Sequence, residues 1–354
     1  MTDKLKDLRN RIDALDARLV KLLSARARLA QRIGTLKQGA VYRPEREAQV
    51  LRRVAQLNPG PLSGRALARV FTEVMSACRA LEDSLTVAYL GPEGTFSQEA
   101  ALKHFGGMAP AAACASIDEV FRKVETGAVG YGVVPVENST EGAIGRTLDL
   151  LLTTSAKVCG EVMLPVRQCL MGKAKNRADI RKVYSHTQSL AQCQQWLARK
   201  LPHAERVAVV SNAEAAQFAA KDRHAAAIAS RTAAARYGLN LLARNIEDEP
   251  KNTTRFLVLA GHGTAPSGKD KTSLILSTRN VPGAIHDLLT PLAANQVSMT
   301  RLESRPARTG LWEYVFYVDI EGHQQSANVA KALAELEQKA SFLKNLGSYP
   351  AAII

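Results

Sequence analysis

The sequence lacks a long hydrophobic run. Its first ten residues, MTDKLKDLRN, mix both signs of charge, whereas a signal peptide carries an apolar stretch behind a basic start. Elsewhere no apolar run approaches the roughly 20 residues that a helix needs to span a bilayer. We therefore expect a cytoplasmic protein with no membrane partner.

Cysteine and aromatic residues are scarce. The five cysteines are odd in number, form no CxxC pair and have no histidine at ligand spacing, so we expect reduced thiols, no metal and no other cofactor. Aromatic residues make up 5% of the chain, and no run of five like charges occurs. The net charge of +14 therefore does not indicate nucleic acid, and an acidic surface or small anionic substrates remain as explanations.

The chain is too long for one ordinary core. Its 354 residues predict two or three domains of roughly 100–200 residues each. A hydrophobic content of 46% with 23% charged residues is typical of globular proteins. The residue pattern changes near residue 85 and again after residue 260, which favours three segments.

The first segment predicts a long helix with a cation in its apolar seam. Apolar residues from Leu5 to Leu36 are spaced alternately by three and four positions, and Arg26 takes one of these places. This spacing predicts one helix about 50 Å long. Breakers then separate a second helix, about 45–57, from a third, about 63–85. Helices with this much apolar surface indicate a helical dimer.

A cation in an apolar seam costs several kcal/mol unless an anion meets it. One reading of Arg26 is a buried salt bridge, and the other is an anionic ligand. Lys37 lies on nearly the same face about 16 Å further along, within reach of a shared ligand. Arg9 lies about 25 Å away in the opposite direction, so only an antiparallel partner chain would bring an Arg9 to the site.

Residues 4–84 resemble the all-helical chorismate mutase family. The stretches LRNRIDALDARLVKLLSARARLAQRIGTLK and RPERE carry the resemblance, and they include charged positions as well as the apolar repeat. The resemblance implies that this segment rearranges chorismate to prephenate. A pericyclic rearrangement needs no nucleophile or metal, only a compact substrate conformer and donors where charge grows on the ether oxygen.

The same resemblance implies roles for five residues. Arg26 and the Arg9 of a partner chain would hold the two carboxylates of chorismate, with help from Arg46. Lys37 would donate to the ether oxygen, and Glu47 would accept from the ring hydroxyl. Solvated surface charges remain the alternative for those on polar helix faces.

Glu82 stands where the mutase family often has glutamine as a second donor to the ether oxygen. An ionised carboxylate only accepts hydrogen bonds and would repel that oxygen. We therefore expect a mutase rate that rises below neutral pH. The alternative is a surface carboxylate at a helix end.

The second segment alternates short strands with helices, which predicts α/β architecture. The turn LGPEGTFS at 90–97 opens a helix with the hydroxyls of Thr95 and Ser97, which suit an anion. Polar residues follow other predicted strands, where strand ends meet at a crevice: Glu137, Asn138, Ser139, Ser185, His186, Gln188, Thr254 and Arg255. Helix caps and turns are the alternative for each of them.

Residues 86–262 resemble prephenate dehydratase in four ordered motifs, GPEGTFSQEAA, VPVENSTEGAI, YSHTQ and NTTRF. The resemblance implies two α/β subdomains around a cleft, as in periplasmic binding proteins. It also makes Thr254 the key hydroxyl, supported by Glu137, Asn138 and Ser139, with Arg255 and the other polar residues binding substrate. Prephenate loses carbon dioxide and its ring hydroxyl, and the gain of aromaticity means that a positioned donor is enough.

The last segment predicts a sensor. Residues 261–271, GHGTAPSGKDK, indicate a flexible linker, and the order βαββαβ that follows predicts a ferredoxin-like sandwich. The motifs PGAI and ESRP resemble an ACT regulatory domain. The resemblance implies that phenylalanine binds between paired domains and inhibits the dehydratase, through Gly283, Ala284, Ile285, Glu303, Ser304 and Arg305.

Together the segments predict a multidomain protein. We expect an all-α mutase dimer domain at 1–85, a two-subdomain α/β dehydratase at 86–262 and an α+β ACT domain at 272–354. The expected activity is that of a bifunctional enzyme of phenylalanine biosynthesis, feedback-inhibited by L-phenylalanine, as a homodimer with a tetramer left open. Two alternatives remain: a second domain that acts on L-arogenate, and a non-catalytic ligand-binding regulator.

Overall fold

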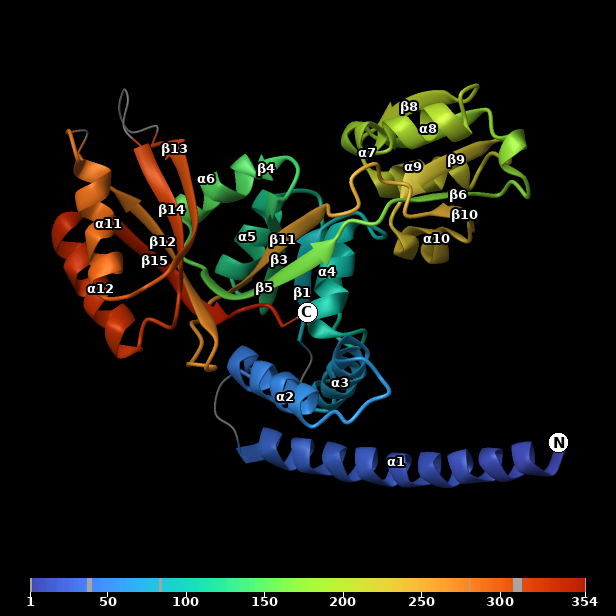
Figure 1. Ribbon diagram of the computed structural model, residues 1–354, viewed down its shortest axis with the longest axis horizontal. Helices are drawn as coiled ribbons and strands as arrows, with labels where there is room; N and C mark the ends of the chain where they lie inside the picture. The colour runs from blue at the N-terminus through green and yellow to red at the C-terminus, as the bar shows by residue number, and fades with distance from the viewer. Residues whose placement is uncertain (1, 37–39, 83–84, 280, 308–313, 354) are drawn as a thin grey trace.

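The computed structural model describes residues 2–36, 40–82, 85–279, 281–307 and 314–353. It shows a helical unit, a two-lobed α/β unit and a C-terminal α+β unit (Figure 1). The expected multidomain fold class is thereby confirmed. No described helix is both long and apolar enough to cross a membrane.

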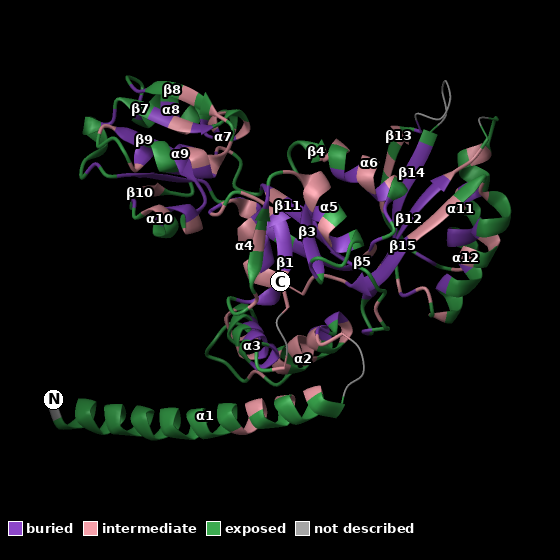
Figure 2. Ribbon diagram, turned by 180° about the vertical axis from the view of Figure 1, so that it is seen from behind, coloured by how far each residue is buried: buried purple, intermediate pink, exposed green. Residues whose placement is uncertain are grey.

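The helical unit consists of α1 (Thr2–Leu36), α2 (Pro44–Gln56) and α3 (Gly64–Arg79). Helix α1 projects as a free arm beneath α2 and α3 (Figure 1) and is exposed over most of its length (Figure 2). Its large apolar side chains are 45–83% exposed: Leu5, Leu8, Ile12, Leu15, Leu19, Val20, Leu22, Leu23, Leu29, Ile33 and Leu36. A face this apolar is stabilised by packing on another surface.

Helix α3 is shorter than the sequence indicates. It begins after Ser63, whose side chain accepts from the backbone of Ala66, and ends at Arg79 instead of near residue 85. The backbone N–H groups of Leu81 and Glu82 bond back to residues 78 and 79, closing a tight turn. This turn directs the chain into the first strand of the two-lobed unit.

The first lobe contains a mixed sheet in the order β2-β1-β3-β11-β5, with β4 beside β3. Strands β1, β2 and β3 are parallel, whereas β11 returns from the second lobe and runs antiparallel between β3 and β5. The elements are β1 (Val87–Leu90), α4 (Phe96–Phe105), β2 (Ala111–Cys114), α5 (Ile117–Glu125), β3 (Tyr131–Asn138), β4 (Gly142–Ala143), α6 (Gly145–Thr153), β5 (Lys157–Pro165) and β11 (Thr253–Ala260).

The second lobe contains a sheet in the order β10-β6-β9-β7-β8. Alanines fill one side of its core, so that helices approach the sheet closely: Ala215, Ala216, Ala219, Ala227, Ala229, Ala233 and Ala234. The elements are β6 (Cys169–Gly172), η1 (Arg177–Asp179), β7 (Lys182–His186), α7 (Thr187–Gln192), α8 (Gln194–Lys200), β8 (Glu205–Val209), α9 (Asn212–Ala219), β9 (Ala225–Ala229), α10 (Arg231–Tyr237) and β10 (Asn240–Arg244). The chain crosses between the lobes twice, after β5 and before β11.

The C-terminal unit has the ferredoxin-like strand order β13-β14-β12-β15, as expected. Helices α11 and α12 cover the outer face of this antiparallel sheet (Figure 1). The elements are β12 (Asp270–Ser277), α11 (Ala284–Ala294), β13 (Met299–Pro306), β14 (Tyr314–Glu321), α12 (Ala327–Lys339) and β15 (Phe342–Pro350).

The inner face of this sheet shares a core with the first lobe. Ile275, Tyr317 and Leu346 belong to the same buried cluster as Leu148 and Leu257. At Gly347, whose φ is +135°, a Cβ would lie 2.4 Å from the backbone oxygen of Val158. Only glycine lets β15 lie this close to β5, so the two units are packed against each other.

Residues 261–269 form a bound loop instead of the flexible linker expected at 261–271, and residues 270 and 271 already belong to β12. Arg52 of α2 donates to the backbone oxygens of Ser267 and Lys269, both at 2.8 Å. Ser267 is buried, and its hydroxyl donates to the carboxylate of Asp270. The composition of the segment suggested flexibility, but contacts with a distant helix fix it.

Candidate active sites and effector site

The helical unit contains a basic pocket. It encloses about 430 Å³ between α1, α2 and α3 and is lined by Arg26, Leu29, Ala30, Ile33, Val41, Arg43, Arg46, Glu47, Val50, Met75, Cys78, Arg79 and Glu82. The guanidinium of Arg26 donates to the thiol of Cys78 at 2.9 Å. Four arginines and two glutamates in one pocket favour an anionic ligand.

Arg79 holds Glu47 in this pocket. This residue is 6% exposed, and its guanidinium forms an ion pair with the carboxylate of Glu47, donates to the backbone oxygen of Phe105 in α4 and lies over the ring of Tyr42. Glu82 packs against α1, where a Cβ on Gly34 would lie 3.0 Å from the Cγ of Glu82. The absence of a side chain at Gly34 therefore lets Glu82 reach the pocket.

Four residues expected in the mutase site, Arg26, Arg46, Glu47 and Glu82, line this one pocket. Arg9 lies on the exposed part of α1 and does not line it. Lys37 lies outside the described residues. Sequence reasoning missed Arg79, because nothing in a helical pattern marks an arginine that bonds to an element further along the chain.

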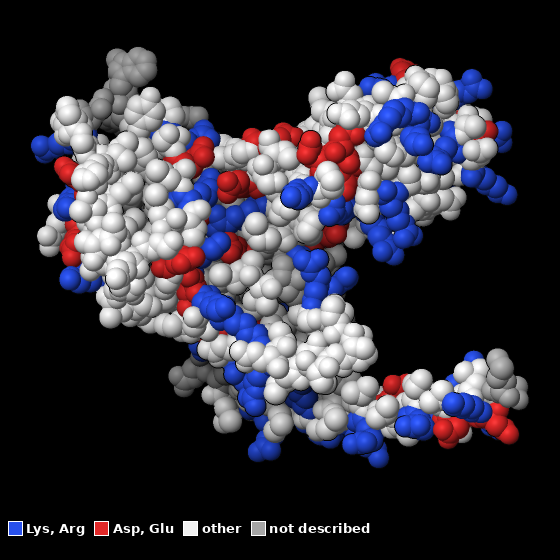
Figure 3. Space-filling model, viewed as in Figure 1, with Lys and Arg blue, Asp and Glu red and all other residues white. Residues whose placement is uncertain are grey.

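The two lobes enclose a second cavity of about 390 Å³. Its lining comes from β1, α4 and the start of β11 on one side and from α7 and α9 on the other: Leu90, Gly91, Pro92, Thr95, Phe96, Ser97, Ala115, Asn138, Val166, Gln168, His186, Gln188, Ser189, Gln192, Val210, Ser211, Asn212 and Thr254. Figure 3 shows several groups of lysine and arginine side chains on the visible face of the second lobe. The lining residues, in contrast, include no aspartate, glutamate, lysine or arginine.

Thr254 is held with its hydroxyl ready to donate. The side-chain oxygen of Asn138 accepts from the backbone of Thr140 at 3.0 Å and of Glu141 at 3.2 Å, which fixes the orientation of its amide. The amide nitrogen of Asn138 therefore donates to Thr254 Oγ1 at 2.9 Å. Since Thr254 accepts this bond, its hydroxyl hydrogen can point to a ligand in the cavity.

Helix starts and side-chain amides line the rest of this cavity. Helix α4 is capped by Thr95, α7 by His186 and α9 by Ser211, and all three caps lie at the cavity. Free N–H groups at helix starts stabilise negative charge. Gln168 donates to Ser189 Oγ at 3.0 Å, and Asn212 donates to the same oxygen at 2.9 Å. These two amides carried no sequence signal, since each is a single polar residue outside any motif.

Six expected residues line the cavity: Thr95, Ser97, Asn138, His186, Gln188 and Thr254. Ser185 is buried below it, with its hydroxyl oxygen 3.0 Å from Asn212 Oδ1 and 2.7 Å from the backbone oxygen of Ile228, between which its one hydrogen is shared. The hydroxyl of Ser139 accepts from the backbone of Thr253 at 2.9 Å.

Glu137 and Arg255 point away from the cavity, which corrects the expectation that Arg255 binds a substrate carboxylate. Successive side chains of a strand face opposite sides. Because Thr254 and Asn138 face the cavity, Arg255 and Glu137 face the C-terminal unit. Arg255 there forms ion pairs with Glu161 and Asp319.

The C-terminal unit lies beside a third, wide cavity of about 1080 Å³. It is lined by Leu152, Thr153, Ser277, Thr278, Arg279, Val281, Gly283, Ala284, Ile285, His286, Ala307, Tyr314, Val315, Phe316, Ser341 and Phe342. Gly283, with φ of +79°, is the N-cap of α11. Three expected effector residues, Gly283, Ala284 and Ile285, lie here, whereas Glu303, Ser304 and Arg305 do not line the cavity.

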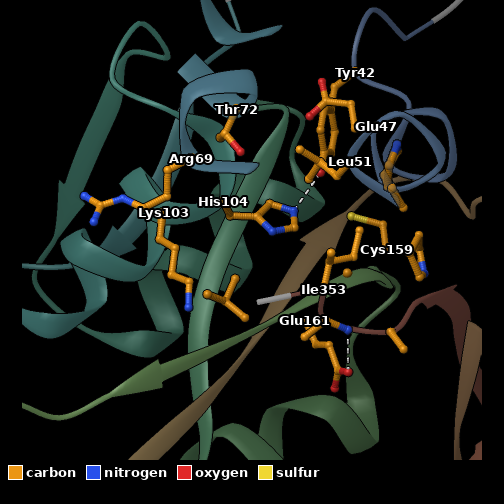
Figure 4. A pocket seen from close by; sticks show the side chains of 17 residues that line it. Tyr42, Glu47, Leu51, Arg69, Thr72, Lys103, His104, Cys159, Glu161 and Ile353 are labelled. Atoms are coloured by element: carbon orange, nitrogen blue, oxygen red, sulfur yellow. Dashed lines mark hydrogen bonds between the residues drawn. The ribbon is translucent and has the colours of Figure 1, made fainter. Parts of the chain in front are cut away.

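A smaller pocket lies where the three units meet (Figure 4). The hydroxyl of Tyr42, just before α2, and Nε2 of His104 in α4 share a hydrogen bond of 2.6 Å. Burial, with help from the charges of Arg79 and Lys103, lowers the pKa of His104 to about 3. The imidazole is therefore neutral, and it joins the helical unit to the first lobe.

The three units correspond to three known families. The family models for chorismate mutase type II, prephenate dehydratase and the ACT domain match residues 8–83, 87–264 and 272–338. A bifunctional chorismate mutase/prephenate dehydratase of Neisseria gonorrhoeae is 55% identical over 350 residues, which span 98% of this chain and 97% of that protein. The chain belongs to the bifunctional chorismate mutase/prephenate dehydratase family.

More distant relatives belong to the same families. The Escherichia coli protein of the same name is 35% identical over 371 residues, spanning 97% of this chain and 95% of that protein. The solved prephenate dehydratase of Arthrobacter aurescens, in complex with L-Phe, is 33% identical, with a TM-score of 0.69 over 75% of this chain and 90% of that one. The prephenate dehydratase structure from Staphylococcus aureus covers the same share of this chain and all of that one, at 28% identity and a TM-score of 0.66.

The family decides one of the two alternatives. An enzyme with a chorismate mutase domain and a prephenate dehydratase domain is confirmed, and the reading as a non-catalytic regulator is set aside. From here on, the helical, two-lobed and C-terminal units are called the mutase, dehydratase and ACT domains.

Proposed function

We propose that the mutase pocket rearranges chorismate to prephenate, that the dehydratase cavity converts prephenate to phenylpyruvate, and that L-phenylalanine bound to the ACT domain inhibits the second step. The observation that carries this proposal is the Asn138–Thr254 hydrogen bond in a cavity between two lobes. We assign the mutase domain to residues 1–85, the dehydratase domain to 86–262 and the ACT domain to 272–354.

In the mutase pocket, positively charged side chains bind the substrate and stabilise the charge that develops during the rearrangement. Arg26 and Arg46 hold carboxylates of chorismate and select the compact conformer from which the rearrangement proceeds. Glu47, fixed by Arg79, accepts from the ring hydroxyl. Lys37 and a protonated Glu82 donate to the ether oxygen as negative charge develops on it.

The second carboxylate requires a partner chain. Arg9 is too far along α1 to enter the pocket of its own chain, and the apolar face of α1 lies exposed. A second α1, running antiparallel, would cover this face and bring its Arg9 to the pocket. We therefore propose a homodimer through α1, and this contact leaves the ACT domains free for further pairing into a tetramer.

In the dehydratase cavity, Thr254 assists departure of the ring hydroxyl. The bond between the ring and its carboxylate breaks with release of carbon dioxide, its electrons complete the aromatic ring, and the ring hydroxyl departs and takes up a proton from solvent to leave as water. The Thr254 hydroxyl donates to the departing oxygen while Asn138 holds it in place. Backbone N–H groups at the starts of α4, α7 and α9 bind the carboxylates.

Prephenate fits this cavity better than L-arogenate. L-Arogenate carries an ammonium group in place of the keto oxygen, and a buried ammonium needs a carboxylate partner. The lining residues include no aspartate or glutamate. The amides of Gln168 and Asn212 and the hydroxyl of Ser189 suit a keto oxygen.

The effector cavity suits an amino acid with an aromatic side chain. Its apolar wall comes from Val315, Phe316 and Phe342, and the start of α11 supplies free N–H groups for a carboxylate. Glu303, Ser304 and Arg305 lie on β13, outside the cavity. Because Arg305 forms an ion pair with Asp149 of α6 in its own chain, we propose that Glu303 and Ser304 reach the effector through pairing with the ACT domain of a second chain.

The test is ultraviolet detection of phenylpyruvate from chorismate alone, from prephenate as control substrate, and with added L-phenylalanine. The Thr254→Ala variant should lose about 100-fold or more of prephenate turnover, the effect of removing one positioned donor, while still consuming chorismate. Thr254→Ser, which keeps the hydroxyl, should retain most of it. Near-normal dehydration by Thr254→Ala would refute the role of Thr254.

A further inference from the structure

Paired strands of the dehydratase domain present one residue pair to the cavity and the next pair to the ACT domain. In the register of β3 with β11, Thr254 lies opposite Asn138, and Arg255 lies opposite Glu137. The first pair meets the cavity through the hydrogen bond between Asn138 and Thr254. The second pair is one residue away on each strand, so it cannot move without moving the first.

The ACT sheet presents a complementary pair. In the register of β13 with β14, Arg301 lies opposite Asp319. Arg301 Nε lies 3.0 Å from Glu137 Oε2, and Arg255 forms an ion pair with Asp319. Glu137, Arg255, Arg301 and Asp319, called here the charge square, therefore join two catalytic strands to two effector-domain strands.

Further bonds fix the buried side of the charge square. Arg255 donates from Nε to Glu161 at 2.9 Å and from Nη2 to the hydroxyl of Tyr349 at 3.0 Å. Ser273 donates to Asp319. Arg255 and Asp319 are 7% and 5% exposed. Such a buried pair adds little net stability, but loss of one partner leaves an uncompensated charge, so the geometry is strongly enforced.

The charge square is also continuous with the effector cavity. Strand β14 carries Asp319 and, a few residues earlier, Val315 and Phe316 of the cavity wall. The opposite wall includes Leu152 and Thr153 of α6. The same helix end accepts three hydrogen bonds from Lys344 of β15. A ligand in the cavity would therefore touch β14 and the end of α6, two elements that join the ACT sheet to the dehydratase domain.

We propose that the charge square is the device through which the ACT domain sets the position of Asn138 and Thr254, and thereby dehydratase turnover. Glu137 and Arg255 are positioning residues, since they touch neither the substrate cavity nor the effector cavity. A shift of β14 that pulls on Arg255 changes the direction of the Thr254 hydroxyl. The proposal rests on the functions proposed above for the cavity and the ACT domain.

The test uses the full-length chain with Asp319→Asn, Arg301→Gln and Glu137→Gln. Prephenate turnover with and without L-phenylalanine gives kcat, KM and the degree of inhibition, and calorimetry gives L-phenylalanine affinity. Each variant should lower kcat with little change in KM, and weaken inhibition at least about fivefold, the lower range of allosteric coupling, while L-phenylalanine still binds. The control variant is Lys157→Gln, which removes a cation at the same interface that is bonded to the backbone of Asn345. It should change neither kcat nor the degree of inhibition.

Glu137→Gln guards against misfolding, because the Glu137 side chain is 36% exposed. The exchanged pair Glu137→Arg with Arg301→Glu should restore part of the inhibition lost in the single variants, which a general loss of stability would not allow. Unchanged kcat and inhibition in all three variants would overturn the proposal, and so would an equal loss of L-phenylalanine affinity. If the unmutated chain dehydrates prephenate without inhibition by L-phenylalanine, the proposed effector function fails instead, and this is measured first.

Discussion

Glu82 occupies an unusual place for a carboxylate in a basic pocket. It follows α3, packs against Gly34 of α1 and lines the same cavity as Arg26. A protonated carboxyl can donate to an ether oxygen, whereas a carboxylate repels it. The protonation of this one group should therefore control the mutase rate.

The Glu82→Gln variant tests this role. The unmutated mutase should become faster as the pH falls from 8 to 5, while Glu82→Gln, a donor at every pH, should show a flat profile and a higher rate at pH 8. Stopped spectrophotometric assays of chorismate consumption measure both profiles. Glu73→Gln, a change on α3 outside the pocket, serves as control. A flat profile for the unmutated chain would rule out the assignment.

Single residues also show what the sequence could and could not predict. The motif NTTRF located Thr254 correctly at the cavity, and alternation then placed Arg255 on the other side of the strand. The motif names both residues, but only the register of β11 with β3 decides which one faces the substrate. Gln168 and Asn212 were missed, because each becomes part of the site only when the second lobe folds over the first.

At the scale of elements, α1 is the clearest case. The three-and-four spacing predicted one long helix, and the structure has one from Thr2 to Leu36 with its apolar face exposed. A shared site would take Arg26 from one chain and Arg9 from the other. The geometry of an isologous dimer makes both sites equivalent.

Mixing two inactive chains tests the shared site. Arg9→Ala and Arg26→Ala should each lack mutase activity, while mixed dimers hold one intact site of two. Random mixing should recover roughly a quarter of the unmutated mutase activity, measured after refolding the two chains together. Dehydratase activity of the mixture serves as internal control. No recovery, with mixed dimers demonstrated by affinity tags, would mean that each site is built from one chain.

Two further segments agree with their sequence patterns to different degrees. The order βαββαβ predicted the ACT sheet, because local periodicity is enough to define it. Residues 261–271 were expected to be flexible from their glycine, serine and lysine content. Arg52 holds this loop from a helix more than 200 positions earlier in the chain, and composition contains no information about such a partner.

At the scale of the whole molecule, a neutral histidine lies at the contact between the mutase and dehydratase domains. His104 bonds to Tyr42, and its folded-state pKa is about 3, whereas an unfolded histidine titrates near 6.5. Between these values the unfolded chain binds a proton that the folded chain does not. The contribution of His104 to the free energy of unfolding is therefore complete above about pH 6.5. It falls as the pH drops toward 3, by at most about 1.4 kcal/mol per pH unit.

Urea unfolding at pH 7, 6 and 5 checks this prediction. The unfolding midpoint of the unmutated chain should fall with pH more steeply than that of His104→Gln, which cannot titrate. His203→Gln, a change at an exposed histidine, should leave the pH dependence unchanged. Parallel curves for the unmutated chain and His104→Gln would show that the imidazole is protonated in the folded protein.

The placement of the three domains could not be predicted from the sequence. Each domain has its own local pattern, but contacts such as Tyr42 with His104 or Arg301 with Glu137 join single residues far apart in the chain. Such pairs leave no periodicity in either segment.

Arg79 has a consequence for the genetics of the two fused enzymes. Its guanidinium binds both Glu47 in the mutase pocket and the backbone of Phe105 in the dehydratase domain. A missense change that displaces the end of α4 would therefore disturb the mutase, although the changed codon belongs to the part of the gene that encodes the dehydratase domain. A screen that scores the two reactions separately would record one such allele as two defects, and its map position would point to the wrong enzyme for one of them.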